Sequence, residues 1–561
     1  MPEPDHAFLQ EHPVVVLANR FVCSLLGSQQ SKTGVVGADG SHSVAAGGVV
    51  YWNFGDTVLA SGAIIPNSLG WSSDRDASDC ITLVPKGTTA SSAPLLPRDP
   101  GSEQSVWPLG MEETSPGTVH FYYASVVKKD GVQGGGVEVA GVGLASFDTE
   151  TLEAERALDG ALPWPAGGPL PSRTFADEEY VYVLHNVAVD AWTTDTVLAR
   201  VPKTEIESLS SYEYWQAGDA VTPGRWLAGL WDEEANGWRP ELSEIEPLWR
   251  QAGNHNGVEL AYNEFLGRWL AVYTSNFMTA VSVRAAEELT GPWDGPETML
   301  VRCSAFHAPI REGFLCYTGT QHEVYARDGG RTIYVTYSNS GAYEVYLHEI
   351  RLAAGIRQWR DKYDRAVYLP AGAEPPDSFA ADGLAFYASD IPVPGFSAIH
   401  RWVGEESGAV RYGAGAPSSP GSTEVFVDRG IDFYAPVDVS TSDGRNARFA
   451  PVYRWTQGDA ERYAALDLAS AGYERHEIAF YAACPDRDSD TLTDCFESFL
   501  GTDASSADTD GDLLRDAYEL DTPGCDPLVY NDDGDGIPSQ EEVLAGTNPC
   551  IWDGDADGDE A

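Results

Sequence analysis

Five stretches in residues 1–355 share one pattern, in which a turn leads into a strand rich in tyrosine, tryptophan or phenylalanine. From residues 47, 117, 178, 267 and 331 they read GGVVYWNFGDT, GTVHFYYASV, EEYVYVLHNVAV, GRWLAVYTS and RTIYVTYSN. A second alternating strand follows several of them, without helical periodicity in between. Such hairpins are typical of a radial array of sheets, so we predict an all-β fold with a five-bladed β-propeller over residues 1–355. A sandwich could use similar strands but would be unusually large.

A second repeat lies further along the chain. Phe386-Tyr387-Ala388 recurs at 433–435 and at 480–482, with IHRW and VYRW between the copies. A fixed period of this size indicates one supersecondary unit used several times. We therefore predict a small, trefoil-like all-β module over residues 356–483. Its aromatic residues either form the core, which the pattern favours, or stack on sugar rings.

Carboxylates recur through residues 484–561 with the spacing of calcium-binding loops. This segment holds 23 Asp and Glu against two Arg. Oxygen-bearing side chains stand at positions 1, 3, 5, 9 and 12 of a twelve-residue loop, which is how ligands surround Ca²⁺. The pattern occurs three times and begins a fourth. The predicted ligands of structural Ca²⁺ are Asp486, Asp488, Asp490, Asp494, Glu497, Asp508, Asp510, Asp512, Asp516, Glu519, Asn531, Asp533, Asp535, Ser539, Glu542, Asp553, Asp555 and Asp557.

These loops differ from EF-hands, because Thr491 and Leu513 replace the usual glycine at position 6 of the first two copies. The phrases GTD at 501–503 and DTDGD at 508–512 resemble the thrombospondin type 3 repeats of secreted bacterial proteins. The alternative is an acidic, disordered tail. We also expect the tail to be the part of the chain that would associate with a cell surface.

Charge and cysteine content restrict the classes of partner and compartment. The formal charge is −51, a field that repels phosphate backbones and excludes nucleic-acid binding, while it attracts divalent cations. The eight cysteines form near neighbours that suggest four disulfides in an oxidising compartment: Cys23–Cys80, Cys303–Cys316, Cys484–Cys495 and Cys525–Cys550. No apolar run approaches the roughly 20 residues of a membrane span. We expect a secreted or cell-surface protein in which Met1 replaces a removed leader, since PEPDHAF does not read as a signal peptide.

The first hairpin carries an acid near each of its two feet, Asp39 and Asp56, with its turn near Gly47. Antiparallel strands lie roughly 4.7–4.9 Å apart, so both acids belong to the same end of the hairpin. Two carboxyl groups in unequal environments at the mouth of a propeller suit glycoside hydrolysis, one as acid and one as base. Alternatively, Asp56 caps a turn and Asp39 accepts backbone hydrogen bonds.

Several short, collinear motifs extend this interpretation over about residues 20–352. They are GADG at 37–40, FGDT at 54–57, WPLG at 107–110, GVELAYNEFLGRWL at 257–270, and HE followed by IYVTYS within 322–338. Together they resemble the five-bladed propeller family of endo-D-arabinanases, long described as a domain of unknown function. The resemblance implies hydrolysis of furanoside linkages, with acids of the first blade as acid and base. These roles map onto Asp39 and Asp56, and no cofactor is expected for the chemistry.

Further side chains are candidates for the same funnel. Glu259 and Glu323 each begin or precede an aromatic hairpin. In related five-bladed enzymes the three working carboxylates come from different blades, so the resemblance implies Asp39, Glu259 and Glu323 as a second catalytic set. The candidates for substrate binding are Trp52, Trp107, His255, Asn256 and His322. Each of these residues has a structural alternative, as a solvated strand end, a core aromatic or a satisfied polar group.

The predicted function is that of a secreted, calcium-stabilised glycoside hydrolase acting on a D-arabinan-like polysaccharide. A non-catalytic carbohydrate-binding or adhesive surface protein is the alternative from another class.

Overall fold

The computed structural model describes residues 14–530 with gaps. These are 27–33, 89–90, 130–135, 190–192, 219–222, 240, 243–244, 253–257, 276–279, 294, 296, 304–315, 418–422, 438–448, 459, 466–467, 484, 489, 491, 495–496, 498–499, 513 and 522–524. The chain forms two compact units, one made largely of residues 18–351 and the other of residues 352–561 with the first 17. No helix in the described ranges has the length and apolar character that crossing a bilayer requires.

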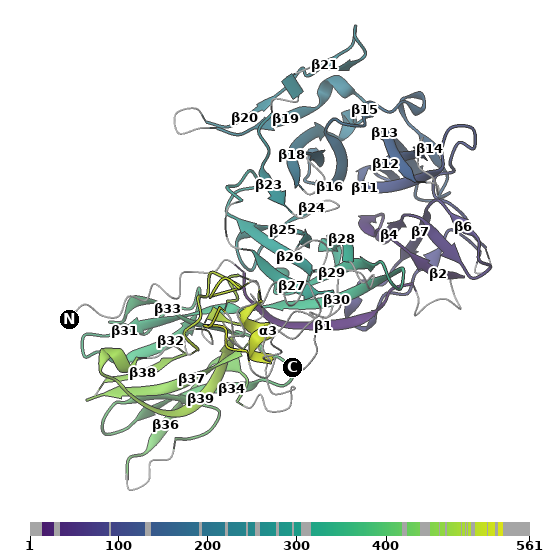
Figure 1. Ribbon diagram of the computed structural model, residues 1–561. Helices are drawn as coiled ribbons and strands as arrows, with labels where there is room; N and C mark the ends of the chain where they lie inside the picture. The colour runs from purple at the N-terminus through teal and green to yellow at the C-terminus, as the bar shows by residue number, and fades with distance from the viewer. Residues whose placement is uncertain are drawn as a thin grey trace, which may run out of the picture. The chain divides into compact units, whose positions relative to one another are not determined.

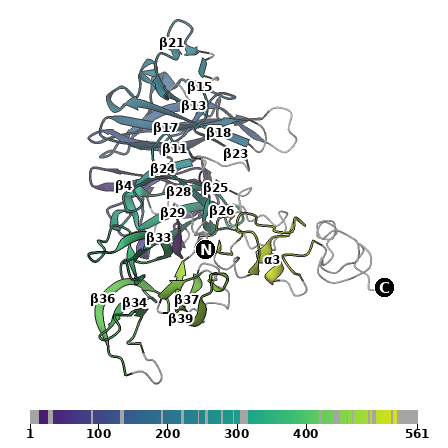
Figure 2. The ribbon, with the colours of Figure 1, turned by 90° about the vertical axis from the view of Figure 1, so that its left-hand side faces the viewer.

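The main part of the first unit is a ring of five antiparallel sheets arranged around a common axis (Figures 1 and 2). From the innermost strand outward, the first sheet contains β3 (His42–Ala46), β4 (Val49–Phe54), β7 (Ser68–Ser72) and β8 (Val84–Pro85). The second contains β11 (Ser105–Ser115), β12 (Thr118–Lys128), β13 (Val137–Asp148) and β14 (Ala154–Arg156). The third contains β16 (Leu170–Ala176), β17 (Tyr180–Ala188), β18 (Thr193–Pro202), β19 (Glu213–Gln216) and β20 (Arg225–Leu227). The fourth contains β24 (Val258–Asn263), β25 (Arg268–Ser275), β26 (Ala280–Ala286) and β27 (Thr298–Arg302). The fifth contains β28 (Cys316–Gln321), β29 (Thr332–Asn339), β30 (Glu344–Leu352) and β1 (Val16–Ser24).

The sheets follow one another around a closed ring. The inner strands β3, β11, β16, β24 and β28 neighbour one another in that order. The ring closes where Ser41 Oγ lies 2.7 Å from Thr336 Oγ1 and Ser43 Oγ lies 2.8 Å from Nδ1 of His322. Strand β1, from the start of the chain, supplies the outer strand of the fifth sheet. The prediction of a five-bladed β-propeller is therefore confirmed.

Apolar side chains fill the spaces between neighbouring blades. Tyr51 of the first blade packs with Phe121 of the second, and Trp52 packs with Tyr334 of the fifth. The disulfide Cys23–Cys80 borders this last cluster, and Cys303–Cys316 connects blades four and five, as predicted. Cys525 is also disulfide-bonded. The other three cysteines, Cys484, Cys495 and Cys550, lie outside the described residues, so their pairing stays a prediction.

The second unit begins with a β-module of threefold internal symmetry. Each repeat has three strands: β31 (Ala354–Arg360), β32 (Ala366–Pro370) and β33 (Ala380–Ala388); β34 (Ser397–Gly404), β35 (Val410–Gly413) and β36 (Phe426–Ala435); β37 (Phe449–Gln457), β38 (Ala460–Ala464) and β39 (Glu474–Ala483). In every repeat the first strand pairs with the other two. The module therefore starts with IRQW at 356–359, a third copy of the IHRW motif that sequence reading missed.

Aromatic residues mark the symmetry axis of this module. The rings of Phe386, Phe433 and Phe480 lie 5.2–5.4 Å apart, and all three are buried. Around them runs a cycle in which each backbone N–H donates to the hydroxyl of the next tyrosine. The distances are 2.9 Å from Tyr368 to Tyr412, 3.1 Å from Tyr412 to Tyr463 and 2.9 Å from Tyr463 to Tyr368. The three repeated phenylalanines and the three tyrosines of the cycle thus form the core of the module.

Candidate active site

The first hairpin brings its two acids together. Its turn is at Gly47 and Gly48, and His42 pairs with Asn53. The pairing continues beyond the blade, where Ala38 of β2 (Val35–Ala38) lies opposite Thr57 of β5 (Thr57–Leu59). Asp39 directly follows the first partner and Asp56 directly precedes the second. Both acids therefore occupy the same end of the hairpin, as predicted from the position of the turn.

Gly55 allows the Asp39 carboxyl group to lie against the opposite strand. The Gly55 N–H donates to the Asp39 carbonyl oxygen at 2.7 Å. A Cβ atom on Gly55 would lie only 2.3 Å from Oδ1 of Asp39. Only a glycine accommodates the carboxyl group in this position, which gives a physical reason for the glycine in the FGDT motif.

Three hydroxyl groups from other blades surround the two acids. Ser105, at the start of β11, donates to Oδ1 of Asp56 at 2.5 Å. Tyr317 of β28 donates to Oδ2 of Asp39 at 3.3 Å. The hydroxyl of Tyr343, in the β29–β30 turn, donates to the Asp56 carbonyl oxygen at 3.0 Å. The site thus draws on the first, second and fifth blades.

The environments of the two acids are unequal. Burial and then the charge of Asp56 raise the pKa of Asp39 to about 6, against hydrogen bonds from Tyr343 and Tyr317 that lower it. Asp56 accepts the short hydrogen bond from Ser105, whose side chain is buried. The two carboxyl groups therefore differ, since Asp39 has a raised pKa and Asp56 accepts a hydrogen bond from a buried hydroxyl group.

Glu259 and Glu323 do not belong to this pair, so the second catalytic set does not form one site. Asp39 contacts Tyr317 at the start of β28, whereas Glu323 follows the end of that strand. At about 3.3 Å per residue the two ends are roughly 15–20 Å apart. The charge of Glu323 acts instead on Glu259, whose pKa burial raises to about 7, and on Glu112.

Glu112 and Arg173 complete this second cluster, and neither residue was predicted, because no motif marks them. Burial raises the pKa of Glu112 to about 8, with further contributions from Glu259 and Glu323. Arg173 is buried, and its Nε lies 3.5 Å from Oε2 of Glu259. Glu323 is exposed to solvent, although desolvation by the surrounding protein still raises its pKa. The propeller thus carries acids toward both ends of its inner strands.

Two of the predicted substrate-binding residues are structural, which corrects the prediction. Trp52 is fully buried, and its Nε1 donates to the Tyr325 hydroxyl at 3.2 Å. His322 is buried beside it, with ring centroids 4.2 Å apart, and both of its nitrogens are bonded, to Ser43 and Thr336. Burial lowers the pKa of His322 to about 3, so it stays neutral. The packing of blades five and one removes both side chains from any substrate.

The remaining substrate-binding candidates stay predictions. Trp107 is half-buried and packs on the apolar cluster between the second and third blades. His255 and Asn256 lie outside the described residues.

The first two loops of the tail have the donor set of a calcium site. Carboxylate oxygens of Asp486, Asp488 and Asp490 lie within 4.8 Å of one another, and those of Asp508, Asp510 and Asp512 do the same. Among the described residues, Oδ2 of Asp490 and Oε2 of Glu497 are buried without a hydrogen-bond partner. Such oxygens are costly to bury unless a cation or proton compensates them. Position 12 of each loop, Glu497 and Glu519, is fully buried, as a bidentate ligand would be.

Some of the other calcium-ligand candidates lie within the described residues and some lie outside them. Asp494 and Asp516, at position 9, are buried beside these oxygens. The last two loops fall outside the described residues and stay predictions. They contain Asn531, Asp533, Asp535, Ser539, Glu542, Asp553, Asp555 and Asp557.

Comparison with known proteins gives one family match. The model of a domain of unknown function, DUF4185, matches residues 147–349. The motifs at 257–270 and 322–338 lie inside that range. No curated protein matches the chain.

Several solved structures are similar in part, all at low identity and low TM-score. A thermostable family-43 glycoside hydrolase is 12% identical, covers 63% of this chain and 98% of its own, and has a TM-score of 0.30. The α-L-arabinofuranosidase of Podospora anserina, solved with cellotriose, is 9% identical over 60% of this chain and 97% of its own, with a TM-score of 0.34. The endo-arabinase of Bacteroides thetaiotaomicron is 12% identical over 57% and 97%, also at 0.34. The fold is therefore assigned from the five sheets of the propeller ring in this chain and not from these similarities.

Proposed function

We propose that this protein is a glycoside hydrolase that cleaves furanoside linkages of a D-arabinan-like polysaccharide. The observation that supports this most is the pair of carboxyl groups of Asp39 and Asp56, side by side at one end of the first hairpin in unequal environments. The motifs at 37–40 and 54–57, which contain both acids, resemble those of endo-D-arabinanases, and this resemblance supports the choice of substrate.

We infer the role of each acid from the unequal environments of the two. Asp39, with its raised pKa, is the general acid that protonates the leaving glycosidic oxygen. Asp56 is the carboxylate that activates water or attacks the anomeric carbon as positive charge develops there. Ser105 keeps Asp56 oriented, and Gly55 leaves space for the Asp39 carboxyl group. Both acids stand on one hairpin of a rigid ring, which keeps their spacing fixed.

The test is the release of new reducing ends from arabinan, arabinogalactan and xylan. We expect release from a furanoside polymer and a loss of at least about 10²-fold for Asp39→Asn and Asp56→Asn. Binding of the glycan without any release would favour the non-catalytic adhesive protein instead. Full activity of both variants would remove the assignment of the acids but leave the class of enzyme intact.

We propose in addition that the tail binds structural Ca²⁺. The clustered oxygens of the first two loops support this, with Asp488, Asp490 and Glu497 as ligands in the first and Asp512 and Glu519 in the second. The ion would neutralise these carboxylates and order the loops, with no part in bond cleavage. Calorimetric titration with Ca²⁺ after chelation tests this, and the lack of uptake would contradict it. Secretion and attachment to a cell surface through this tail remain part of the same proposal.

A further inference from the structure

Two tyrosines of the fifth blade reach the acids of the first blade across the ring closure. Tyr317 donates to Oδ2 of Asp39, from which it is separated by 278 residues in sequence. The Tyr343 hydroxyl donates to the Asp56 carbonyl oxygen across 287 residues and also lowers the pKa of Asp39, which it faces. Both contacts therefore depend on the closure of the propeller, and they link the geometry of the site to the fold.

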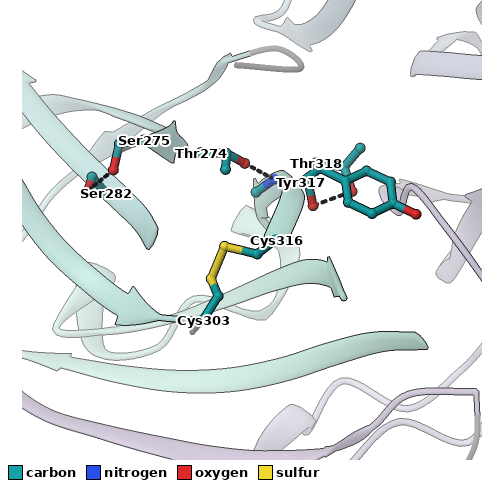
Figure 3. Close-up of a disulfide and its surroundings, with 8 residues drawn as sticks. Thr274, Ser275, Ser282, Cys303, Cys316, Tyr317 and Thr318 are labelled. Carbon is teal, nitrogen blue, oxygen red and sulfur yellow. Dashed lines mark hydrogen bonds between the residues drawn. A yellow bond between two sulfur atoms is a disulfide. The ribbon is translucent and has the colours of Figure 1, made fainter. Parts of the chain in front are cut away.

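The Tyr317 segment is held in place on several sides (Figure 3). Its neighbour Cys316 is joined to Cys303 by a disulfide, and the Tyr317 ring extends away from that bond. Thr318 has a left-handed φ of 54°, and its hydroxyl lies 2.8 Å from Oγ of Ser338. The next residue, Gly319, donates its N–H to Oγ1 of Thr274 at 3.0 Å. This chain segment therefore has little freedom to move its tyrosine.

Tyr343 is held as firmly from the other side. It too has a left-handed φ of 54°, which is unfavourable for a residue with a bulky side chain. Its N–H donates to the Asn339 carbonyl oxygen at 2.8 Å. Gly37 packs so closely that a Cβ there would lie 2.4 Å from the Tyr343 carbonyl oxygen. Backbone strain of this kind persists only where surrounding contacts enforce it, and it tends to occur at functional sites.

We propose that Tyr317 and Tyr343 are positioning residues, whose hydroxyls hold the Asp39 carboxyl group and the Asp56 backbone in their working arrangement. Their part in catalysis rests on the proposed function, but the interaction itself does not. The titratable groups that face Asp39 are Asp56, Tyr317 and Tyr343. The charge of Asp56 favours the protonated form of Asp39, while the two hydroxyls favour the ionised form. The tyrosines therefore limit how far the pKa of the acid rises.

The direct test is Tyr317→Phe, with the carboxyl carbon of Asp39 followed by NMR through a pH titration of the full chain. Loss of the donor should move the Asp39 midpoint upward by about one pH unit. For an active enzyme the alkaline limb of kcat should move upward with it. The control is Tyr346→Phe in β30. The Tyr346 ring packs on Phe21 and Tyr337 and not on the acids.

An unchanged Asp39 midpoint in both Tyr317→Phe and Tyr343→Phe would overturn the inference. If the wild-type protein releases no reducing ends from any polymer, the proposed function fails. The NMR titration still decides on the tyrosines in that case, so the two failures can be told apart.

The two disulfides of the propeller give a second, matched comparison. Replacing Cys303 and Cys316 by alanine frees the segment next to Tyr317 and should shift the Asp39 midpoint in the same direction as Tyr317→Phe. Replacing Cys23 and Cys80 removes the other disulfide, next to the apolar cluster between blades five and one, and should leave that midpoint unchanged. Equal shifts in both pairs would contradict a specific role for the Tyr317 segment.

Discussion

Gly55→Ala tests the arrangement of the two acids without removing either of them. The new Cβ would lie 2.3 Å from Oδ1 of Asp39, while real Cβ contacts begin near 3.0 Å and are ordinary from 3.4 Å. The carboxyl group must therefore retreat by roughly 1 Å. Gly55 is not among the described glycines with a left-handed φ, so the backbone itself accepts alanine. A displacement of about 1 Å at a reacting group can cost on the order of 10²-fold in rate.

The assay is reducing-end release from the polymer that the wild-type protein cleaves, with the melting temperature measured in parallel. We expect about a 10²-fold loss in kcat with an almost unchanged melting temperature. Gly237→Ala is the matched control, because its added Cβ meets no atom closer than 3.9 Å. In the Asp39→Asn background, where the carboxyl group is already absent, Gly55→Ala should cause no further loss of activity. Activity of Gly55→Ala within about twofold of wild type would refute the proposed dependence on the Asp39 position.

Three further predictions follow from the same structure. The pKa of Asp39 is raised above its ordinary value, so its proton stabilises the fold at low pH and this stabilisation is lost as pH rises through about 6. Asp39→Asn should therefore raise stability at pH 7.5 by about 3 kcal/mol while it abolishes activity, and a destabilised variant would contradict this. Asp490→Asn should remove one Ca²⁺ from the calorimetric stoichiometry, and an unchanged stoichiometry would exclude the first loop. Tyr412→Phe leaves the Tyr368 N–H without its acceptor and should cost about 1–3 kcal/mol in denaturant unfolding, whereas the exposed Tyr363→Phe should cost almost nothing.

The sequence predicted those features that depend on local pairing. Asp39 and Asp56 belong to one hairpin, so the position of its turn was enough to place them at the same end. The 47-residue spacing of Phe386, Phe433 and Phe480 predicted a repeated unit for a similar reason. Each repeat folds on itself, and the three phenylalanines meet at the axis.

Features that depend on how blades pack could not be predicted. Trp52 is an aromatic strand residue like many that stack on sugars, and only the closing fifth blade buries it against His322. The contacts of Tyr317 and Tyr343 with the acids join residues far apart in sequence, and no motif spacing encodes them. Glu259 was expected beside Asp39 because the working carboxylates of related five-bladed enzymes come from different blades, but its position along β24 places it with Arg173.

The proposal that Asp39 and Asp56 act together on one glycosidic linkage is tested most directly by a crystal structure of the Asp39→Asn variant with a furanoside oligosaccharide bound. We expect a glycosidic oxygen within hydrogen-bond reach of the residue-39 amide, roughly 2.6–3.2 Å, with the Asp56 carboxylate facing the same linkage. A ligand bound only toward the other end of the inner strands, beside Glu112 and Glu323, would contradict it.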